Sequence, residues 1–392
     1  MNQGATTPDP IALVLGGGGA RAAYQAGVLR YIEEEFPEAV FPIITGVSAG
    51  AINAAYLANH TGVEQGAAAG LAKCWFDISS DQVFQEESVL SLSRRLLGMS
   101  MVGSLLIRRR LADLTLRVKE GEALLSTGPL RDYLTHQLNS ERGVLTGIGE
   151  NLASGRLIAA SITATNYLTG QSVTWVQGRS FEDWQRPNRV GIQADLRLKH
   201  VMASSALPLL FPAERIDGAW YGDGGIRLTA PLSPALHLGA TSILVISTRY
   251  GRSRSEADVP AVQGYPPAAQ VIGMLLNAIF LDVLDQDAQN LEAMNNLIRR
   301  IPPKRRNGLR PVNLLVLRPS VDLGRLSSEY SPEFKGSLKL LTRGLGTGDT
   351  KSPDWLSMLL FDHKYVSLVM EIGFEDARRQ KDKIHAFLCG RP

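Results

Sequence analysis

Ser48 stands at the centre of a Gly-x-Ser-x-Gly pentad that runs from Gly46 to Gly50. The apolar run 41–44 precedes it and the alanine-rich run 49–58 follows it, which is typical of a strand, a sharp turn and a helix. A serine at such a turn has strained backbone, and its crowded neighbours must be small. The helix N-terminus stabilises a developing oxyanion. The pentad therefore indicates a nucleophile for acyl transfer, and an ordinary glycine-rich turn with a capping serine is the alternative.

A second glycine-rich turn, GGGGAR at residues 16–21, follows the apolar run 11–15. Consecutive glycines direct backbone amides into one space, which suits an anion. A dinucleotide site would need glycine at position 22, where the chain has Ala22, and an acidic residue after the next strand. That strand leads into the Ser48 turn instead. An oxyanion hole serving Ser48 is therefore favoured, and a tight packing turn is the remaining alternative.

Two Asp-Gly sequences lie close together downstream, at Asp217 and at Asp223. Asp217-Gly218 lies between short alternating runs and is typical of a hairpin turn. Asp223-Gly224-Gly225 follows the returning strand and precedes an irregular segment, residues 226–231. The doubled glycine permits close approach of the backbone. The sequence therefore predicts different settings for the two aspartates, although a second turn aspartate is the alternative at position 223.

The segments GGGGARAAYQAGVL and GVSAGAINA, with Asp-Gly-Gly downstream, resemble the patatin-like phospholipase family over roughly residues 11–248. The resemblance implies a three-layer α/β/α fold with a mostly parallel central sheet, a Ser–Asp dyad and a glycine-rich oxyanion loop. The implied dyad is Ser48 and Asp223, and the implied oxyanion hole is Gly17, Gly18 and Gly19. The chain departs from the family at Ala22, where the family usually has glycine, so a methyl group would tighten the turn after Arg21.

Five further positions belong to the predicted site: Arg21, Gly46, Gly50, Gly224 and Gly225. Arg21 has two candidate roles, of which holding the glycine loop is favoured over meeting a lipid phosphate. Ser204 and Ser205 are expected to pack, because neither stands between a strand and a helix. The Ser–Asp mechanism requires no imidazole, and none of the six histidines receives a catalytic role.

The elements that must position these groups are read from apolar periodicity. Strands are predicted at 11–15, 41–44, 156–165, 171–176, within 236–248 and at 312–317. Helices are predicted at 22–36, 49–58 and 268–297, and the tail 330–387 is helical in pattern. The predicted organisation is an N-terminal tail (1–10), a catalytic domain (11–248) with a helical cap at about 60–150, and a mostly helical extension (249–392) packed on the core.

Composition excludes several classes of protein. With 44% hydrophobic and 20% charged residues, the chain is ordinary globular protein. A net charge of +3 is too small to indicate nucleic-acid binding, and two cysteines are too few for a disulfide framework. No ligand cluster surrounds them, so neither metal nor cofactor is predicted. No signal peptide or membrane-spanning run is evident, which predicts a cytoplasmic protein.

The predicted reaction is hydrolysis of fatty-acyl esters through an acyl-serine, of the phospholipase A or lysophospholipase type, with phospholipid or lysophospholipid as substrate. The apolar segment 96–107, flanked by arginines, favours a cap over the site, with peripheral contact to a membrane surface as a compatible reading. Two other functions remain open: an acyltransferase that uses the same dyad, and a lipid-binding regulatory protein with a weak site. The oligomeric state is left open.

Overall fold

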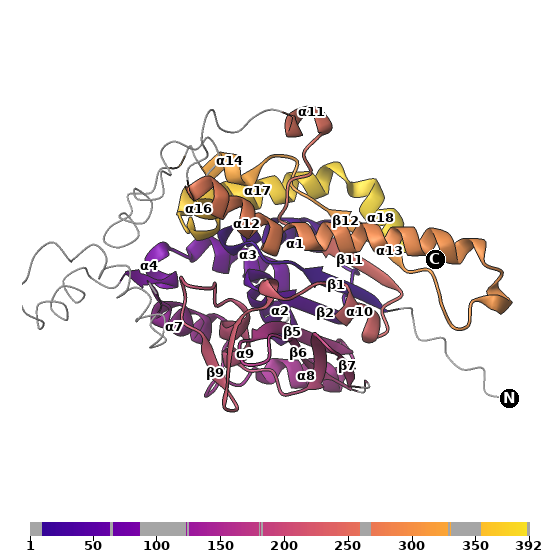
Figure 1. The fold of residues 1–392 in the computed structure, drawn as a ribbon, viewed down its shortest axis with the longest axis horizontal. Coiled ribbons are helices and arrows are strands. Elements are labelled where there is room, and N and C mark those ends of the chain that lie inside the picture. The colour runs from indigo at the N-terminus through magenta and orange to yellow at the C-terminus, as the bar shows by residue number, and fades with distance from the viewer. Residues whose placement is uncertain are drawn as a thin grey trace, which may run out of the picture.

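A computed structural model describes residues 10–62, 66–86, 125–179, 183–258, 268–327 and 354–389, together with residues 123, 181 and 330. The arginine-flanked segment 96–107 and the rest of residues 87–122 of the predicted cap lie outside the described residues. The chain is a three-layer α/β/α structure, in which helices cover both faces of a mostly parallel sheet (Figure 1).

Ten strands within the described residues form the central sheet, with the order β12-β11-β1-β2-β5-β6-β8-β7, and β10 pairs with both β5 and β9. The five strands from β12 to β5 are mutually parallel, and β6 runs antiparallel to β5. Their bounds are β1 (Ile11–Leu15), β2 (Ile43–Val47), β5 (Ala159–Asn166), β6 (Ser172–Gly178), β7 (Trp184–Arg186), β8 (Arg189–Gln193), β9 (Glu214–Ile216), β10 (Ala219–Asp223), β11 (Ser242–Ile246) and β12 (Asn313–Leu317).

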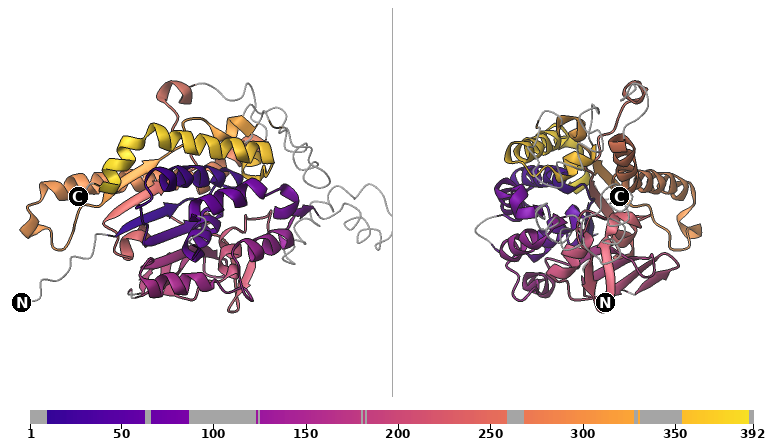
Figure 2. Two further views of the ribbon diagram at one scale, coloured as in Figure 1. Left: turned by 180° about the vertical axis from the view of Figure 1, so that it is seen from behind. Right: turned by 60° about the vertical axis from the view of Figure 1, so that its left-hand side comes forward.

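The alternation of side chains along β1 shows how the two faces of the sheet are covered. Leu13 and Leu15 pack into the larger core, whose helices include α1 (Ala23–Glu35), α2 (Ala49–Asn59), α3 (Ala67–Asp77) and α17 (His363–Arg379). Ala12 and Val14 pack into the smaller core under α10 (Ser233–His237) and α13 (Asp282–Arg300). The two views of Figure 2 show α17 lying along α1.

The remaining helices and short elements complete the layers and the loops. They are α4 (Ser80–Val83), α7 (Gly128–Gln137), α8 (Thr146–Ser154), α9 (Leu198–Ser204), α11 (Arg254–Ala257), α12 (Ala268–Phe280), α14 (Leu323–Ser327), α16 (Asp354–Leu359) and α18 (Lys381–Cys389), the 3-10 turns η1 (Gly19–Ala22), η2 (Gly224–Ile226) and η3 (Pro303–Arg305), and the pair β3 (Gln85–Glu86) and β4 (Leu125–Ser126).

Most predicted elements are present, but one helix that was predicted to be continuous is divided into two. The predicted helix 268–297 is divided at Leu281 into α12 and α13. Phe280 and Leu281 turn into the larger core there, and both are buried. Because α12 and α13 each bury one face, the apolar repeat continues across the break and hides it. The division of the chain at residue 248 stays a prediction, and β12 from the later part extends the same sheet.

Candidate active site

The register of the sheet brings Ser48 and Asp223 together. Val47, the last residue of β2, pairs with Thr163 of β5. Asp223, the last residue of β10, pairs with Ala164, the next residue along the same strand. Strand β10 therefore pairs with β5 directly beyond the point where β2 stops pairing with it. Ser48 is the residue that follows β2 at that point. Two residues far apart in the sequence become neighbours through adjacent pairings on one strand.

Ser48 lies at a sharp turn between β2 and α2, with φ 57° and ψ −134°. This left-handed φ is costly for a residue with a side chain, and such strain persists only where the surroundings hold it. The neighbours are tightly packed, as predicted from the pentad. A Cβ at Gly46 would lie 2.6 Å from the Ala54 methyl, and one at Gly50 would lie 2.3 Å from the Leu15 carbonyl oxygen. Ser48 itself is only 2% exposed.

The dyad is joined by a direct hydrogen bond. Ser48 Oγ donates to Asp223 Oδ2 at 2.6 Å, with no imidazole between them. The other carboxylate oxygen, Oδ1, accepts from the Gly225 amide at 2.8 Å. Asp223 is fully buried, and this burial raises its pKa to about 7, against the opposing effect of the hydrogen bonds from Ser48 and Gly225. Such a carboxylate is a stronger base than a solvated one.

The glycine loop lies against the serine. A Cβ at Gly17 would lie 2.9 Å from Ser48 Cβ, and Gly19 lines the same pocket as Ser48. Gly18 has φ 147°, and Thr248 Oγ1 donates to the Gly17 carbonyl at 2.6 Å. Within the described residues, the amides of Gly17 and Gly18 donate no hydrogen bond to the protein. These donors are thus uncommitted beside Ser48.

A buried network of amide side chains fixes both ends of this loop. Gln25 Nε2 donates to the carbonyls of Gly16 at 2.9 Å and Ile246 at 3.1 Å. Asn53 Nδ2 donates to the Ala22 carbonyl at 3.1 Å and to Gln25 Oε1 at 2.8 Å. Because these bonds hold carbonyl groups at both ends of the turn, they restrict its backbone orientation.

Ala22 and Arg21 complete the turn without strain. Ala22 has φ −66° and ψ −11°, ordinary right-handed values, so its methyl group requires no unusual backbone. Arg21 is only 3% exposed, and its Nε donates to Ser357 Oγ of α16 at 2.6 Å. The guanidinium therefore points into the protein toward the C-terminal helices, rather than outward. A Cβ at Gly19 would lie 2.1 Å from the Met358 carbonyl of the same helix.

Glycines 224 and 225 follow the aspartate in an equally confined turn. A Cβ at Gly224 would lie 2.1 Å from the Thr163 carbonyl oxygen, and one at Gly225 would lie 2.4 Å from the Phe280 ring. The Asp217-Gly218 pair instead joins β9 to β10 with φ 49° and 87°, in the predicted hairpin turn. The two Asp-Gly sequences therefore differ in setting as expected.

Ser204 contacts Ser48 in a way that its sequence context did not indicate. Its hydroxyl accepts from the Ser48 amide at 2.9 Å and donates to the Thr163 carbonyl at 2.6 Å. Ser204 thus links the strained turn to β5. Its packing was predicted, but this link was not, because a hydrogen bond across more than 150 positions leaves no local pattern.

We expect Ser204→Ala to lower kcat about tenfold and stability by about 2 kcal/mol, because it leaves two buried backbone groups without their partner. Steady-state kinetics and urea unfolding measure these effects. The matched control is Ser161→Ala on β5, since the buried Ser161 hydroxyl has no partner among the described residues. Equal behaviour of the two variants would show that Ser204 does not support the site.

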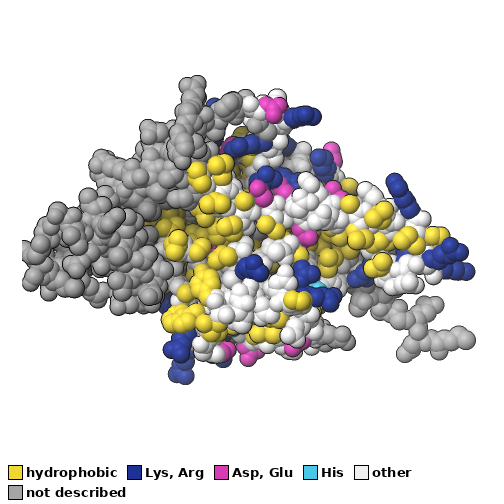
Figure 3. All heavy atoms as spheres, viewed as in Figure 1, with side chains coloured by type: hydrophobic (Ala, Val, Ile, Leu, Met, Phe, Trp, Pro, Cys, Tyr) yellow, Lys and Arg dark blue, Asp and Glu magenta, His cyan; other side chains and the backbone are white. Residues whose placement is uncertain are grey.

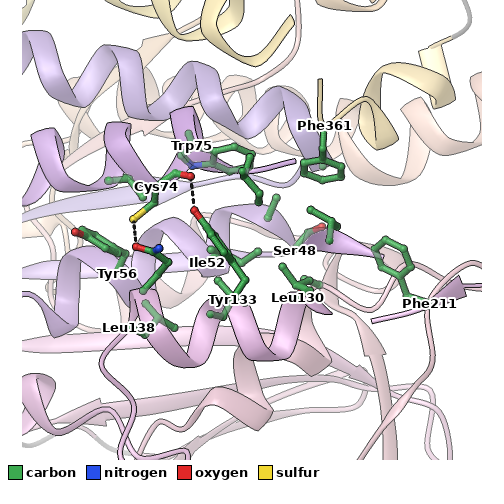
Figure 4. Close-up of a pocket in the computed structure, with 18 of the residues that line it drawn as sticks. Ser48, Ile52, Tyr56, Cys74, Trp75, Leu130, Tyr133, Leu138, Phe211 and Phe361 are labelled. Carbon is green, nitrogen blue, oxygen red and sulfur yellow. Dashed lines mark hydrogen bonds between the residues drawn. The ribbon is translucent and has the colours of Figure 1, made fainter. Parts of the chain in front are cut away.

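An apolar pocket opens at Ser48 and runs between α2, α3 and α7 (Figure 4). Aliphatic and aromatic side chains form its walls, and Phe211 and Phe361 lie toward its serine end. The residues that line it include Ser48, Ala49, Ile52, Tyr56, Cys74, Tyr133 and Gln137. A serine hydroxyl beside such a pocket suits reaction with an ester that carries an apolar chain.

The described residues contain no group of three or more His, Cys, Asp or Glu side chains placed to hold a metal ion. The helices found among them are too short or too polar to cross a bilayer.

A family model and a curated relative match the sequence of this chain. The model of the patatin-like phospholipase family matches residues 13–236. The chain is 28% identical over 231 residues to the cGAMP-activated phospholipase of Pseudomonas aeruginosa (strain BWHPSA011 / Pa011), covering 57% of this chain and 55% of that relative. The chain thus spans about half the length of this curated relative.

Two similar solved structures cover nearly the whole chain. VipD from Legionella pneumophila has a TM-score of 0.40 and 13% identity, over 96% of this chain and 67% of VipD. Human GIVD cytosolic phospholipase A2 has a TM-score of 0.46 and 12% identity, over 97% of this chain and 60% of that protein. The family model covers more than half of the sequence and includes both Ser48 and Asp223, and the chain therefore belongs to the patatin-like phospholipase family.

Proposed function

We propose that the protein hydrolyses fatty-acyl esters of phospholipids or lysophospholipids through a Ser48–Asp223 dyad. The observation that carries the proposal is the 2.6 Å hydrogen bond from Ser48 Oγ to the buried Asp223 carboxylate, at the mouth of an apolar pocket. Family membership supports a lipid substrate. The relative from Pseudomonas aeruginosa is itself named a phospholipase.

The proposed reaction has two steps. Ser48 Oγ attacks the ester carbonyl while Asp223 accepts the hydroxyl proton, and the alcohol leaves with that proton. Water then attacks the acyl-serine, again with Asp223 as the base, and releases the fatty acid. The amides of Gly17, Gly18 and Gly19 stabilise the oxyanion in both steps, and losing one such donor in other hydrolases costs about 3 kcal/mol.

An exposed apolar face supports contact with a lipid surface. Val271, Met274 and Leu275 of α12 are 40–58% exposed, and hydrophobic side chains gather over this helix in Figure 3. The same helix ends at Phe280, which packs against Gly225 beside the dyad. An apolar helix face at the surface and a catalytic turn at its end fit an enzyme that acts on lipid at an interface.

The deciding assay measures fatty-acid release from phospholipid and lysophospholipid vesicles, with the products identified by mass spectrometry. It is run with and without cGAMP, because a relative is named for activation by that nucleotide. Release of free fatty acid supports hydrolysis, whereas transfer to an added alcohol identifies an acyltransferase. Absence of turnover together with no labelling of Ser48 by a fluorophosphonate would exclude the proposed enzyme.

The pH profile of kcat/KM is expected to rise with pH through about 7. Asp223 must be ionised to accept the serine proton, and burial raises its pKa to about 7. Below this value the ionised fraction falls about tenfold per pH unit, so activity should fall in proportion. A soluble ester assayed between about pH 5 and pH 9 measures the profile. A flat profile across this interval would contradict Asp223 as the base.

A further inference from the structure

The apolar pocket that starts at Ser48 ends at three polar side chains. Cys74 Sγ donates to Gln137 Oε1 at 3.0 Å, and Tyr56 lines the pocket beside them. Tyr133 Oη donates to the Cys74 carbonyl at 2.6 Å. Figure 4 shows Tyr56 and Cys74 at the end of the pocket away from Ser48 and Phe211. We call Tyr56, Cys74 and Gln137 the polar floor.

Helix α2 gives the length of the pocket. Ala49, Ile52 and Tyr56 lie three and four positions apart, on one face of α2, and all three line the pocket. At about 1.5 Å per residue, the axial distance from Ser48 to Tyr56 is about 12 Å. Carbon–carbon bonds of about 1.5 Å advance roughly 1.3 Å each in an extended chain, so about nine or ten carbons span this distance.

The polar floor carries no charge near neutral pH. Burial raises the pKa of the Cys74 thiol to about 11 and that of the Tyr56 hydroxyl to about 12. Among the described residues that line the pocket, no side chain is acidic, basic or imidazole. The pocket therefore offers no partner for a charged group, and its walls favour a hydrocarbon chain.

We infer that this pocket holds the acyl chain of the scissile ester and that the polar floor sets its preferred length at about ten carbons. The inference rests on the proposed function, because it places the ester carbon at Ser48. Each methylene of the acyl chain that lies between Ser48 and the polar floor moves from water into contact with the apolar wall of the pocket. Further methylenes meet hydrogen-bonded polar atoms or must separate them, and so gain no such contact.

A series of soluble esters with increasing acyl length tests this inference. Up to about ten carbons, each added methylene should raise kcat/KM about fourfold, the factor that corresponds to about 0.8 kcal/mol. Beyond that length kcat/KM should level off or fall. A rise that continues unbroken to long chains would overturn the inference.

Two variants on opposite sides of α2 locate the chain. Ile52→Phe narrows the pocket about halfway along. The acyl length at which kcat/KM stops rising, called the break, should therefore become shorter, and long esters should lose more activity than short ones. The matched control is Leu57→Phe, because Leu57 lines a separate cavity beside Phe41 and Ile44. Its break should stay in place. An unmoved break in Ile52→Phe, or an equal shift in both variants, would contradict the assignment.

The thiol of Cys74 reports directly on occupation of the polar floor. In a Cys389→Ser background Cys74 is the remaining cysteine. Hexyl and tetradecyl fluorophosphonates are attached to Ser48, and the rate of Cys74 alkylation is measured by mass spectrometry under alkaline conditions. The tetradecyl adduct should slow alkylation at least about tenfold, and the hexyl adduct should leave it near the rate of the free enzyme.

The outcomes separate the two proposals. Labelling of Ser48 with equal Cys74 alkylation in both adducts overturns the chain site and leaves the proposed function intact. Failure of every phosphonate to label Ser48 overturns the proposed function and the chain site with it. Strong protection by the tetradecyl adduct alone supports both.

Discussion

Ser48→Ala and Asp223→Asn should each lower kcat for ester hydrolysis by at least about 10³-fold. The first removes the proposed nucleophile, and the second removes the proposed base while keeping the shape of the side chain. Because the two residues act through one hydrogen bond of 2.6 Å, the double variant should be hardly less active than either single variant. Initial rates with a soluble ester and with phospholipid vesicles measure the loss.

The matched control for the aspartate is Asp217→Asn. Asp217 also precedes a glycine, but it lies in the exposed β9–β10 turn, where Asn also tolerates its φ of 49°. This variant should retain wild-type activity. Circular dichroism and thermal unfolding establish that the inactive variants remain folded. If Asp223→Asn kept more than about a tenth of the activity, direct proton transfer to Asp223 would be excluded.

Gly50→Ala should destabilise the protein by about 3 kcal/mol and abolish most activity. The new methyl group would lie 2.3 Å from the Leu15 carbonyl oxygen and 2.4 Å from that of Gly16, both of which belong to the backbone. Backbone cannot move aside as a side chain can. Helix α2 must therefore separate from β1, which displaces Ser48 from the glycine loop. Urea unfolding and ester kinetics measure the two effects.

Gly149→Ala provides the comparison for the same substitution in another helix. Gly149 lies exposed within α8, and nothing lies within 4 Å of its added Cβ. Alanine there should stabilise the protein by up to about 1 kcal/mol, since it restricts the unfolded chain and favours the helix. If Gly50→Ala were as stable as Gly149→Ala, the close contact between α2 and β1 would be wrong.

The sequence predicted the local structure around the dyad well. The Ser48 pentad requires small residues for a steric reason, and the two Asp-Gly pairs differ in the runs that flank them. These are properties of neighbouring residues, and the strand, turn and helix around Ser48 are present as expected. The proximity of Ser48 and Asp223 was implied only by family resemblance, since it depends on how two strands share one edge of β5.

The unpredicted hydrogen bonds around the site are long-range. Ser204 reaches Ser48 and Thr163 from another element, and Gln25 and Asn53 bridge two helices to the glycine loop. Each is a polar residue in an apolar setting, which signals a buried partner but does not identify it. The break at Leu281 was missed for a different reason, because helices α12 and α13 carry the same apolar repeat.

Helix α16 contacts the glycine loop, and this contact determines how much of the chain a fragment with an intact site must contain. The match to the family model ends at residue 236, yet Ser357 and Met358 contact Arg21 and Gly19 from far beyond that point. A fragment that ended at residue 236 would lose strand β11, which pairs with β1, and also the contacts of Ser357 and Met358 with the glycine loop. The segment that matches the family model and the segment needed to hold the glycine loop in place therefore end at different residues.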